Sequence, residues 1–331
     1  MHFTRLIRAW RFVVPSLVLA AGVAVYAGNA SASSRHSSSS VTTINLNIIP
    51  IPDLAAVYVG IKEGYFAKEK LKPNITLSPS GGPAVVPAVV SGKAQFGAPA
   101  YSDLILAVSK GFPLVAVASA DAAGPTNATD YQYLVTTKKS GITSLKQLAG
   151  KTIAINSLDG LGQVEVDAAL SNAGVNYKTV HYVAINFPQQ AAALTSGRAA
   201  AAQMVEPFIT QIDGENVGAK KLVGLDHAVA PSLPVAVFFT SKSYYTSHPS
   251  VVHRFQTVIR EAQQYITAHP SVARSVIPQY TGVSGSLAAK ILMPFYPTRT
   301  NTAAIQALDN DMKKYGVISK EPALSTFMRL N

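Results

Sequence analysis

The chain alternates short apolar runs with longer segments in which apolar residues recur at helical spacing. Runs typical of β-strands lie at residues 43–49, 75–78, 95–98, 113–119, 152–156, 180–185 and 200–205. Most of them are followed by a segment with the periodicity of a helix. This rhythm predicts an α/β protein built from βαβ units, with mostly parallel sheets.

A short motif occurs twice and indicates that two halves share one plan. Residues 89–94 (VVSGKA) resemble residues 194–199 (LTSGRA), and a short apolar run and then a proline follow in each case. Glycine after a helix can adopt the left-handed conformation that ends it, so two ordinary helix ends would also produce this echo. If the echo marks two lobes, the chain crosses between them twice, near residues 133–137 and 235–240.

This interpretation divides the chain into one discontinuous and one continuous lobe. We predict that residues 44–132 and 241–331 form lobe 1 and that residues 133–240 form lobe 2. The total of 331 residues is suitable for two domains. Two lobes joined by two crossing strands can close on a ligand by a hinge motion.

The first 32 residues have the features of a secretory signal peptide. A basic start without acidic residues precedes an apolar run at 12–27, and small residues at 30–32 predict cleavage after Ala32. An uncleaved anchor is the alternative, but the apolar run is shorter than the roughly 20 residues that span a bilayer. The Ser-rich segment 33–43 predicts a flexible leader.

The composition disfavours most catalytic and nucleic-acid functions. The chain has no cysteine, so it has no thiol nucleophile and no cysteine-ligated metal. Its seven histidines lack metal-binding spacing, and no nucleophile elbow or phosphate-binding lysine loop is present. The 28 basic residues exceed the 17 acidic ones but are scattered, which does not indicate a nucleic-acid surface. We predict no enzyme, no metal and no other cofactor.

The candidate site follows from a rule of open parallel sheets, whose ligands bind beyond the carboxyl ends of the strands. Five strand-end loops meet this condition, three in the predicted lobe 1 and two in lobe 2. The candidate ligand-binding residues in these loops are Pro52, Asp53, Ser80, Gly81, Gly82, Ala100, Tyr101, Ser157, Asp159, Gly160 and Glu206.

Two of these loops contain glycines and open helices. Residues 80–82 and 157–160 could direct backbone N–H groups at an anionic part of a ligand, where a helix dipole is favourable. Each loop could equally be a simple capped turn, with a serine side chain as the cap.

The acidic and aromatic candidates have structural alternatives of their own. Asp53 and Asp159 could cap the helices that follow them or contact a ligand. Tyr101 could stack on a ligand or be partly buried in the core. Glu206, at a strand end before a proline, could face the ligand.

Five segments, in order and at matching spacing, resemble the nitrate/sulfonate/taurine-type solute-binding proteins of ABC importers. They are 56–66 (AVYVGIKEGYF), 91–97 (SGKAQFG), 111–117 (GFPLVAV), 141–151 (GITSLKQLAGK) and 205–208 (VEPF). The resemblance implies a type II periplasmic-binding-protein fold with a ligand cleft between its lobes. It also implies partnership with an ABC permease and its ATPase.

The resemblance further implies a function. We expect the extracytoplasmic component of an importer, a monomer that captures a small polar solute of the aliphatic sulfonate, taurine or nitrate class by lobe closure. Because no cysteine is available for a lipid anchor, a freely diffusing periplasmic or secreted protein is favoured.

Alternatives within the same superfamily stay open. One is binding of the aminopyrimidine precursor of thiamine, and another is an enzyme or sensor module on the same fold. The yeast-type enzyme that makes this pyrimidine relies on a cysteine-rich motif, which this chain lacks. The candidate loops bring Asp53, Asp159 and Glu206 but no Arg or Lys, which suits an aminosulfonate zwitterion or an aminopyrimidine.

Overall fold

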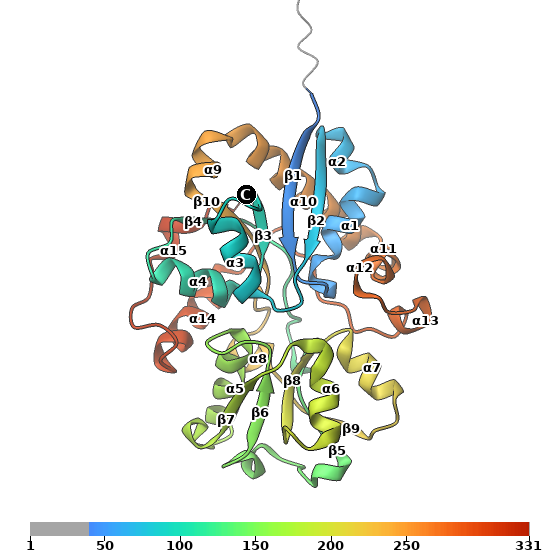
Figure 1. Ribbon diagram of the computed structural model, residues 1–331, viewed down its shortest axis with the longest axis vertical. Helices are drawn as coiled ribbons and strands as arrows, with labels where there is room; N and C mark the ends of the chain where they lie inside the picture. Colours follow the sequence, from blue (N-terminus) through green and yellow to red (C-terminus); the bar gives the residue numbers. More distant parts are fainter. Residues whose placement is uncertain (1–39, 331) are drawn as a thin grey trace, which may run out of the picture. The chain divides into compact units, whose positions relative to one another are not determined.

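A computed structural model describes residues 40–330 and contains two five-stranded sheets, each with its own helices (Figure 1). The predicted signal peptide and most of the predicted leader lie outside the described residues. The predicted leader was assigned two residues too many at its end. Thr42 and Thr43 already belong to the first strand and pair with Leu71 and Lys72 in the first sheet.

The first sheet has the strand order β2-β1-β3-β10-β4. Strand β1 is parallel to β2 and β3, whereas β10 is antiparallel to β3 and β4. The strands are β1 (Thr42–Ile48), β2 (Leu71–Leu77), β3 (Phe96–Ala98), β4 (Leu114–Ser119) and β10 (Val237–Ser241).

The second sheet repeats this plan with the order β7-β6-β8-β5-β9. Strand β6 is parallel to β7 and β8, and β5 is antiparallel to β8 and β9. The strands are β5 (Gln132–Thr137), β6 (Thr152–Ile155), β7 (His181–Ala184), β8 (Ala201–Val205) and β9 (Ala219–Gly224). The predicted α/β fold with two lobes is confirmed, and both sheets are mixed because each crossing strand runs against its two neighbours.

Helices follow the strands as the apolar rhythm predicts. The first lobe contains the 3₁₀ turn η1 (Pro52–Leu54), α1 (Ala55–Lys62), α2 (Tyr65–Lys68), α3 (Gly82–Val90) and α4 (Tyr101–Ser109). The second contains α5 (Leu161–Asn172), α6 (Phe187–Ser196), α7 (Phe208–Gly214) and α8 (Asp226–Val229). Short 3₁₀ turns occupy Asn127–Thr129, Lys138–Ser140, Leu145–Leu148 and Tyr177–Thr179.

After β10 the chain is helical. These helices are α9 (Lys242–Ser247), α10 (Pro249–Ala268), α11 (Pro270–Val276), α12 (Pro278–Thr281), α13 (Gly285–Ala288), α14 (Thr302–Lys314) and α15 (Leu324–Phe327). Helix α14 packs against α4 of the first lobe and against α5 and α8 of the second. Within residues 40–330, no helix is both long and apolar enough to cross a membrane.

The first lobe is held by an aromatic centre between its sheet and α10. Helix α10 buries residues at helical spacing, among them Val251, Phe255, Val258 and Ile259. The ring of Phe255 stacks on Phe96 of β3 with centroids 4.1 Å apart. Burial of each such side chain contributes about 1.5–3 kcal/mol, so this packing fixes β3 and the loop that follows it.

The repeated Ser-Gly motif has the predicted role at two helix ends. Gly92 and Gly197 have φ values of 76° and 79° and end α3 and α6. The strands that follow, β3 and β8, occupy equivalent positions beside the crossing strands β10 and β5. The echo in the sequence therefore reflects two lobes of the same design.

The return crossing ends earlier than the sequence suggests. Residues 237–240, which the sequence assigns to the second lobe, form β10 and pair with β3 and β4 of the first sheet. They are buried on both sides, so the connection between lobes is made by the residues that precede them. The other lobe boundaries stay a prediction.

Candidate functional site

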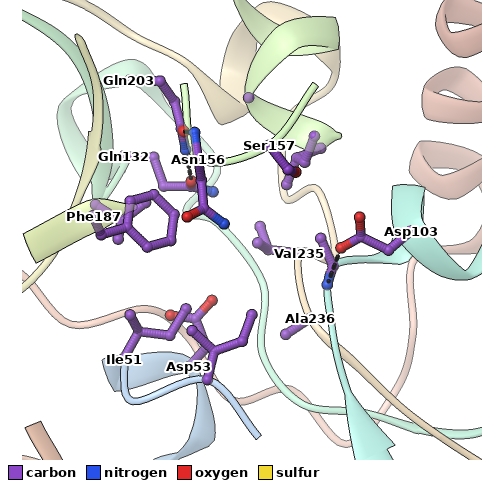
Figure 2. A pocket seen from close by; sticks show the side chains of 15 residues that line it. Ile51, Asp53, Asp103, Gln132, Asn156, Ser157, Phe187, Gln203, Val235 and Ala236 are labelled. Atoms are coloured by element: carbon purple, nitrogen blue, oxygen red, sulfur yellow. Dashed lines mark hydrogen bonds between the residues drawn. The ribbon is translucent and has the colours of Figure 1, made fainter. Parts of the chain in front are cut away.

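A cavity lies where the loops of the two sheets meet (Figure 2). The first lobe contributes the loop after β1 and the residues that begin α4, and the second lobe contributes the loop after β6 and the first residues of α5 and α6. Both crossing connections also reach it, through Gln132 before the rest of β5 and through Val235 and Ala236 before β10. The apolar lining includes Ile49, Ile51, Leu161, Phe187, Val205 and Val235, and the polar side chains are Asp53, Asp103, Gln132, Asn156, Ser157 and Gln203.

Three of the predicted residues line this cavity, namely Asp53, Ala100 and Ser157. Gly81 lies against it, because a Cβ atom at this position would be 2.8 Å from Nδ2 of Asn156 in the other lobe. The strand-end rule therefore brings residues of both lobes together, although their contact with a solute remains a prediction.

Five other predicted residues do not line the cavity: Pro52, Ser80, Gly82, Asp159 and Gly160. The carbonyl of Pro52 accepts a hydrogen bond from the Tyr296 hydroxyl at 2.6 Å. Asp159 is exposed, and its backbone N–H donates to Oε1 of Gln163 at 3.0 Å. These positions shape the loops that carry the cavity residues.

Tyr101 points away from the cavity into the first lobe. Its side chain is fully buried, and its hydroxyl is 2.6 Å from Oγ of Ser119, which in turn contacts Thr300 at 2.8 Å. Of the two roles that the sequence leaves open for Tyr101, the structure gives the buried one.

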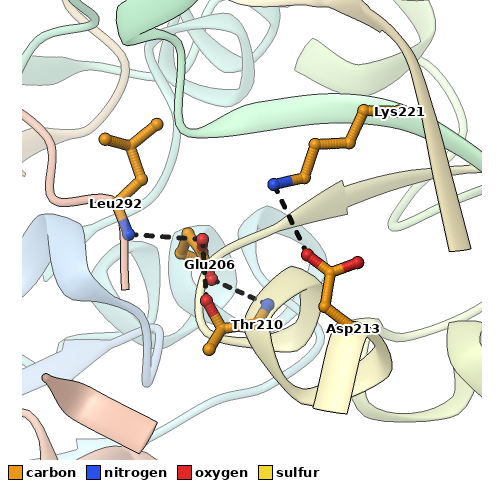
Figure 3. A network of polar contacts seen from close by, with 5 residues as sticks. All are labelled: Glu206, Thr210, Asp213, Lys221 and Leu292. Atoms are coloured by element: carbon orange, nitrogen blue, oxygen red, sulfur yellow. Dashed lines mark hydrogen bonds and ion pairs between the residues drawn. The ribbon is translucent and has the colours of Figure 1, made fainter. Parts of the chain in front are cut away.

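Glu206 lies outside the cavity, in a polar contact between the lobes (Figure 3). Its carboxylate accepts from the backbone N–H and the hydroxyl of Thr210, at 3.1 and 3.0 Å. It also accepts from the N–H of Leu292 at 3.3 Å, which follows Ile291 in the core beside α1. Burial raises the pKa of Glu206 above its usual value. Through this bond the side chain joins the second lobe to the segment that contains Leu292.

Asp53 brings a carboxylate to the base of the cavity. The side chain is 1% exposed; Oδ2 accepts from the Tyr131 hydroxyl at 3.1 Å, whereas Oδ1 has no partner. Burial raises the pKa of Asp53 to about 7. An unpaired buried acceptor is costly, so this oxygen favours a ligand that donates a hydrogen bond or carries a positive charge.

Asp103 supplies a second acid on the opposite wall (Figure 2). Its Oδ2 accepts from the N–H of Ala100 at 3.2 Å, which fixes the start of α4. Burial raises the pKa of Asp103 to about 7. A Cβ atom at Gly82 would overlap this carboxylate, so glycine at position 82 makes room for it.

A relay of amides forms the wall on the second lobe. Gln132 donates to Asp226 at 2.6 Å and accepts from Gln203 at 3.1 Å, while Gln203 accepts from the N–H of Asn156 at 3.3 Å. These bonds hold the cavity-lining amides in defined orientations. Oδ1 of Asn156 has no partner and is a further acceptor for a solute.

The sequence reasoning missed several of these lining residues. Gln132 and Gln203 lie within buried strands, and a lone glutamine in a run such as AAQMV is a signal that could have identified Gln203. Asn156 is adjacent to Ser157 in a candidate loop. Phe187 begins α6 and faces the cavity. The sequence did not identify it, because an aromatic residue at the start of a helix is more simply explained by packing in the core.

The charge of the lining is acidic without a basic counterpart. The lining residues include two carboxylates and three amides but no Lys, Arg or His. Among residues 40–330, no three His, Asp or Glu side chains are grouped as a metal ion would require. The arrangement can accept hydrogen bonds and compensate positive charge.

The two lobes, the paired crossing strands and the cavity between them are those of the periplasmic-binding-protein fold. Two solved structures share it at 13–14% identity. The alkanesulfonate-binding protein of Xanthomonas axonopodis pv. citri, bound to MOPS, matches with a TM-score of 0.72 over 88% of this chain and 99% of that one. The nitrate-binding protein of Synechocystis PCC 6803 matches with a TM-score of 0.72 over 87% and 86%.

Within this fold, the chain belongs to the NMT1/THI5-like family, because the sequence model of that family matches residues 51–273. A Haemophilus influenzae protein whose provisional name assigns it to thiamine biosynthesis is 27% identical over 286 residues. That match covers 83% of this chain and 87% of the relative.

Proposed function

We propose that the protein is the extracytoplasmic solute-binding component of an ABC importer and captures a small polar solute by closure of its lobes. The observation that carries this proposal is the cavity, whose walls come from both lobes and both crossing connections. The lining offers hydrogen-bond acceptors and one aromatic ring rather than a nucleophile held by a base. A binding protein needs only this, so catalysis is not part of the proposal.

The solute class that we propose is that of aliphatic sulfonates, taurine and nitrate, and the cavity favours a member with an amino group. Asp53 and Asp103 would accept hydrogen bonds from an ammonium group and compensate its charge. The lining contains no basic side chain that would repel the ammonium or pair with these carboxyls instead. The start of α5, with Leu161 and Gly162 in the lining, would offer its N-terminal dipole to a sulfonate. Taurine carries both groups.

A second candidate is an aminopyrimidine, which Phe187 specifically favours. Its ring lines the cavity and stacks on Phe208, with centroids 6.0 Å apart. A flat heteroaromatic solute could pack against this ring while Asn156 and Asp53 accept its amino hydrogens.

The partners and the location follow from the proposed role. A permease and its ATPase would receive the solute, and no nucleic acid or cofactor is involved. The predicted signal peptide would direct the protein to the periplasm or outside the cell. Release of the protein by osmotic shock, with the first 32 residues absent from its mass, is the expected result.

A binding screen tests the solute. Thermal-shift and calorimetric titrations would compare taurine, methanesulfonate, nitrate and 4-amino-2-methylpyrimidine. A solute at 100 times its Kd adds about 2.7 kcal/mol of stability. The variant Asn156→Ala should weaken binding, whereas Asn310→Ala, on the exposed face of α14, should not. Failure of every solute to bind would overturn the proposed class, and recovery of a changed solute would indicate an enzyme.

A further inference from the structure

Three buried oxygen-bearing side chains lie directly behind the cavity. The Tyr131 hydroxyl is 3.1 Å from Oδ2 of Asp53 and 2.5 Å from Oδ2 of Asp121. None of the three residues is more than 1% exposed. Bulk solvent therefore does not reach these contacts, and we assign their hydrogens to the residues themselves.

Two hydrogen bonds need two hydrogens, and the phenol of Tyr131 supplies one. If it donates to one carboxylate, the facing oxygen of the other carboxylate needs a proton of its own to bond the phenol oxygen. Two ionised carboxylates on one phenol oxygen would also repel each other in a medium of low dielectric constant. The geometry therefore requires one extra proton on the pair Asp53 and Asp121.

The surroundings do not offer a positive charge in place of this proton. The titratable groups that interact with the pair are Tyr101, Tyr131, Tyr280, Tyr296, Glu165 and Asp226. In the described part of the chain, neither carboxylate forms an ion pair, because the four ion pairs involve other residues. Burial, followed by the charge of Asp53, raises the pKa of Asp121 well above its usual value.

The pair is connected to the cavity and to both crossings. Oδ1 of Asp53 is the unpaired acceptor at the cavity base, while Oδ1 of Asp121 accepts from the N–H of Ala236 at 2.8 Å. Ala236 also lines the cavity and directly precedes β10, and Tyr131 directly precedes β5. A change of charge at Asp53 is thus transmitted to the residues that join the lobes.

We propose that Asp53, Tyr131 and Asp121 hold one shared proton behind the cavity, and that a solute with a cationic head replaces it. This inference deepens the proposed function and rests on it. On binding, an N–H···O bond forms between the solute and Oδ1 of Asp53, and the carboxyl proton leaves to water. Charge is conserved because one cation enters as one proton departs. Asp121 is a positioning residue that acts through Asp53.

The shared proton is testable without any solute. Carboxyl-carbon NMR of protein labelled at aspartate, titrated from pH 4 to 9 and assigned with Asp53→Asn and Asp121→Asn, should show that the Asp53 and Asp121 signals titrate together and that the pair still holds a proton at pH 6. In Asp121→Asn, the amide can keep the bond from Ala236 and donate to Tyr131, so the proton that the wild-type pair loses last should be absent from the titration. Ionisation of both Asp53 and Asp121 at pH 6 in the wild type would overturn the proposal, whatever solute binds.

The exchange is tested by calorimetry with taurine in buffers of different ionisation heat. Release close to one proton per taurine is expected at pH 6, with affinity rising about tenfold per pH unit while the pair keeps its proton. Methanesulfonate, which lacks the amine, should release none. In Asp53→Asn, which removes the exchanging carboxyl, this release should vanish, and in Asp121→Asn it should be smaller than in the wild type.

The outcomes separate the two proposals. Taurine binding without proton release would refute the exchange but leave the solute-binding function intact. Absence of binding by every amine would refute the proposed solute class and the exchange with it, while the carboxyl spectrum would still decide whether the proton is shared.

Discussion

Gly81 is the position at which a single methyl group should hold the lobes apart. It precedes α3 in the first lobe with φ 67° and ψ −140°, a conformation that residues with a Cβ rarely adopt. A Cβ atom there would lie 2.8 Å from Nδ2 of Asn156 and 3.5 Å from Cδ1 of Ile49. Because Asn156 belongs to the second lobe, Gly81→Ala acts on the closed arrangement as well as on the loop itself.

Two effects of Gly81→Ala can be separated by magnitude. Backbone strain should lower the free energy of unfolding by about 1–3 kcal/mol. The overlap displaces the Asn156 amide from the cavity wall, and a cost of about 1.4 kcal/mol to the bound arrangement lowers the solute affinity about tenfold. Gly64→Ala is the matched control, because Gly64 has φ 76° but a Cβ atom there meets nothing within 4 Å.

The assay combines calorimetric titration of taurine with chemical denaturation and small-angle scattering. Gly64→Ala should lose about 1–2 kcal/mol of stability with unchanged affinity and radius of gyration. Gly81→Ala should lose affinity and show a larger radius of gyration with taurine present. Equal affinity and equal radius in the two variants would refute the argument that Gly81 permits closure.

Three further changes test other parts of the site. Phe187→Leu should weaken binding of 4-amino-2-methylpyrimidine about threefold to tenfold and that of taurine less, as calorimetry would show, because only the pyrimidine stacks on the ring. Asp103 is neutral in the folded protein up to a pKa of about 7, so its contribution to stability is present at low pH and is lost as the pH rises towards 7. The free energy of unfolding, measured by denaturation from pH 5 to 7, should therefore fall with pH. Asp103→Asn should reduce this slope by up to about 1.4 kcal/mol per pH unit; an unchanged slope would show that burial does not raise the pKa of Asp103. Glu206→Gln should cost about 1–3 kcal/mol of stability, because the amide nitrogen replaces one carboxylate oxygen and cannot accept the bond that this oxygen takes, such as that from the N–H of Thr210. Unaltered denaturation would contradict that assignment.

The apolar rhythm was sufficient for the fold class but not for every strand. Strands β6 (TIAI) and β8 (AAQMV) are mostly apolar, and β1 (TTINLNI) alternates polar and apolar residues, so all three are visible in the sequence. Strand β9 was not foreseen, because its sequence AKKLVG mixes lysines with apolar residues at the edge of the second sheet. The antiparallel direction of the crossing strands depends on the path of the chain between lobes, which no local pattern encodes.

The candidate site was predictable only in outline. The strand-end rule selects loops, and it found Asp53 and Ser157 because both lie at the cavity edge of their sheets. It cannot tell which way a side chain points, so Tyr101 and Glu206 were included although one is buried in the first lobe and the other contacts Leu292. It also excludes residues inside strands such as Gln203.

The cavity and the hinge share residues, and this has a mechanical consequence. Gln132 begins the outgoing crossing strand and Ala236 ends the returning connection, yet both line the cavity. Rotation of the lobes about the crossings therefore changes the distance between Asn156 in the second lobe and Asp53 in the first, whose Oδ1 atoms both lack a partner. A solute that donates to both acceptors can do so in one lobe arrangement only, so its binding energy is gained mainly in that arrangement. The same coupling means that the charge of Asp53 affects closure and affinity together.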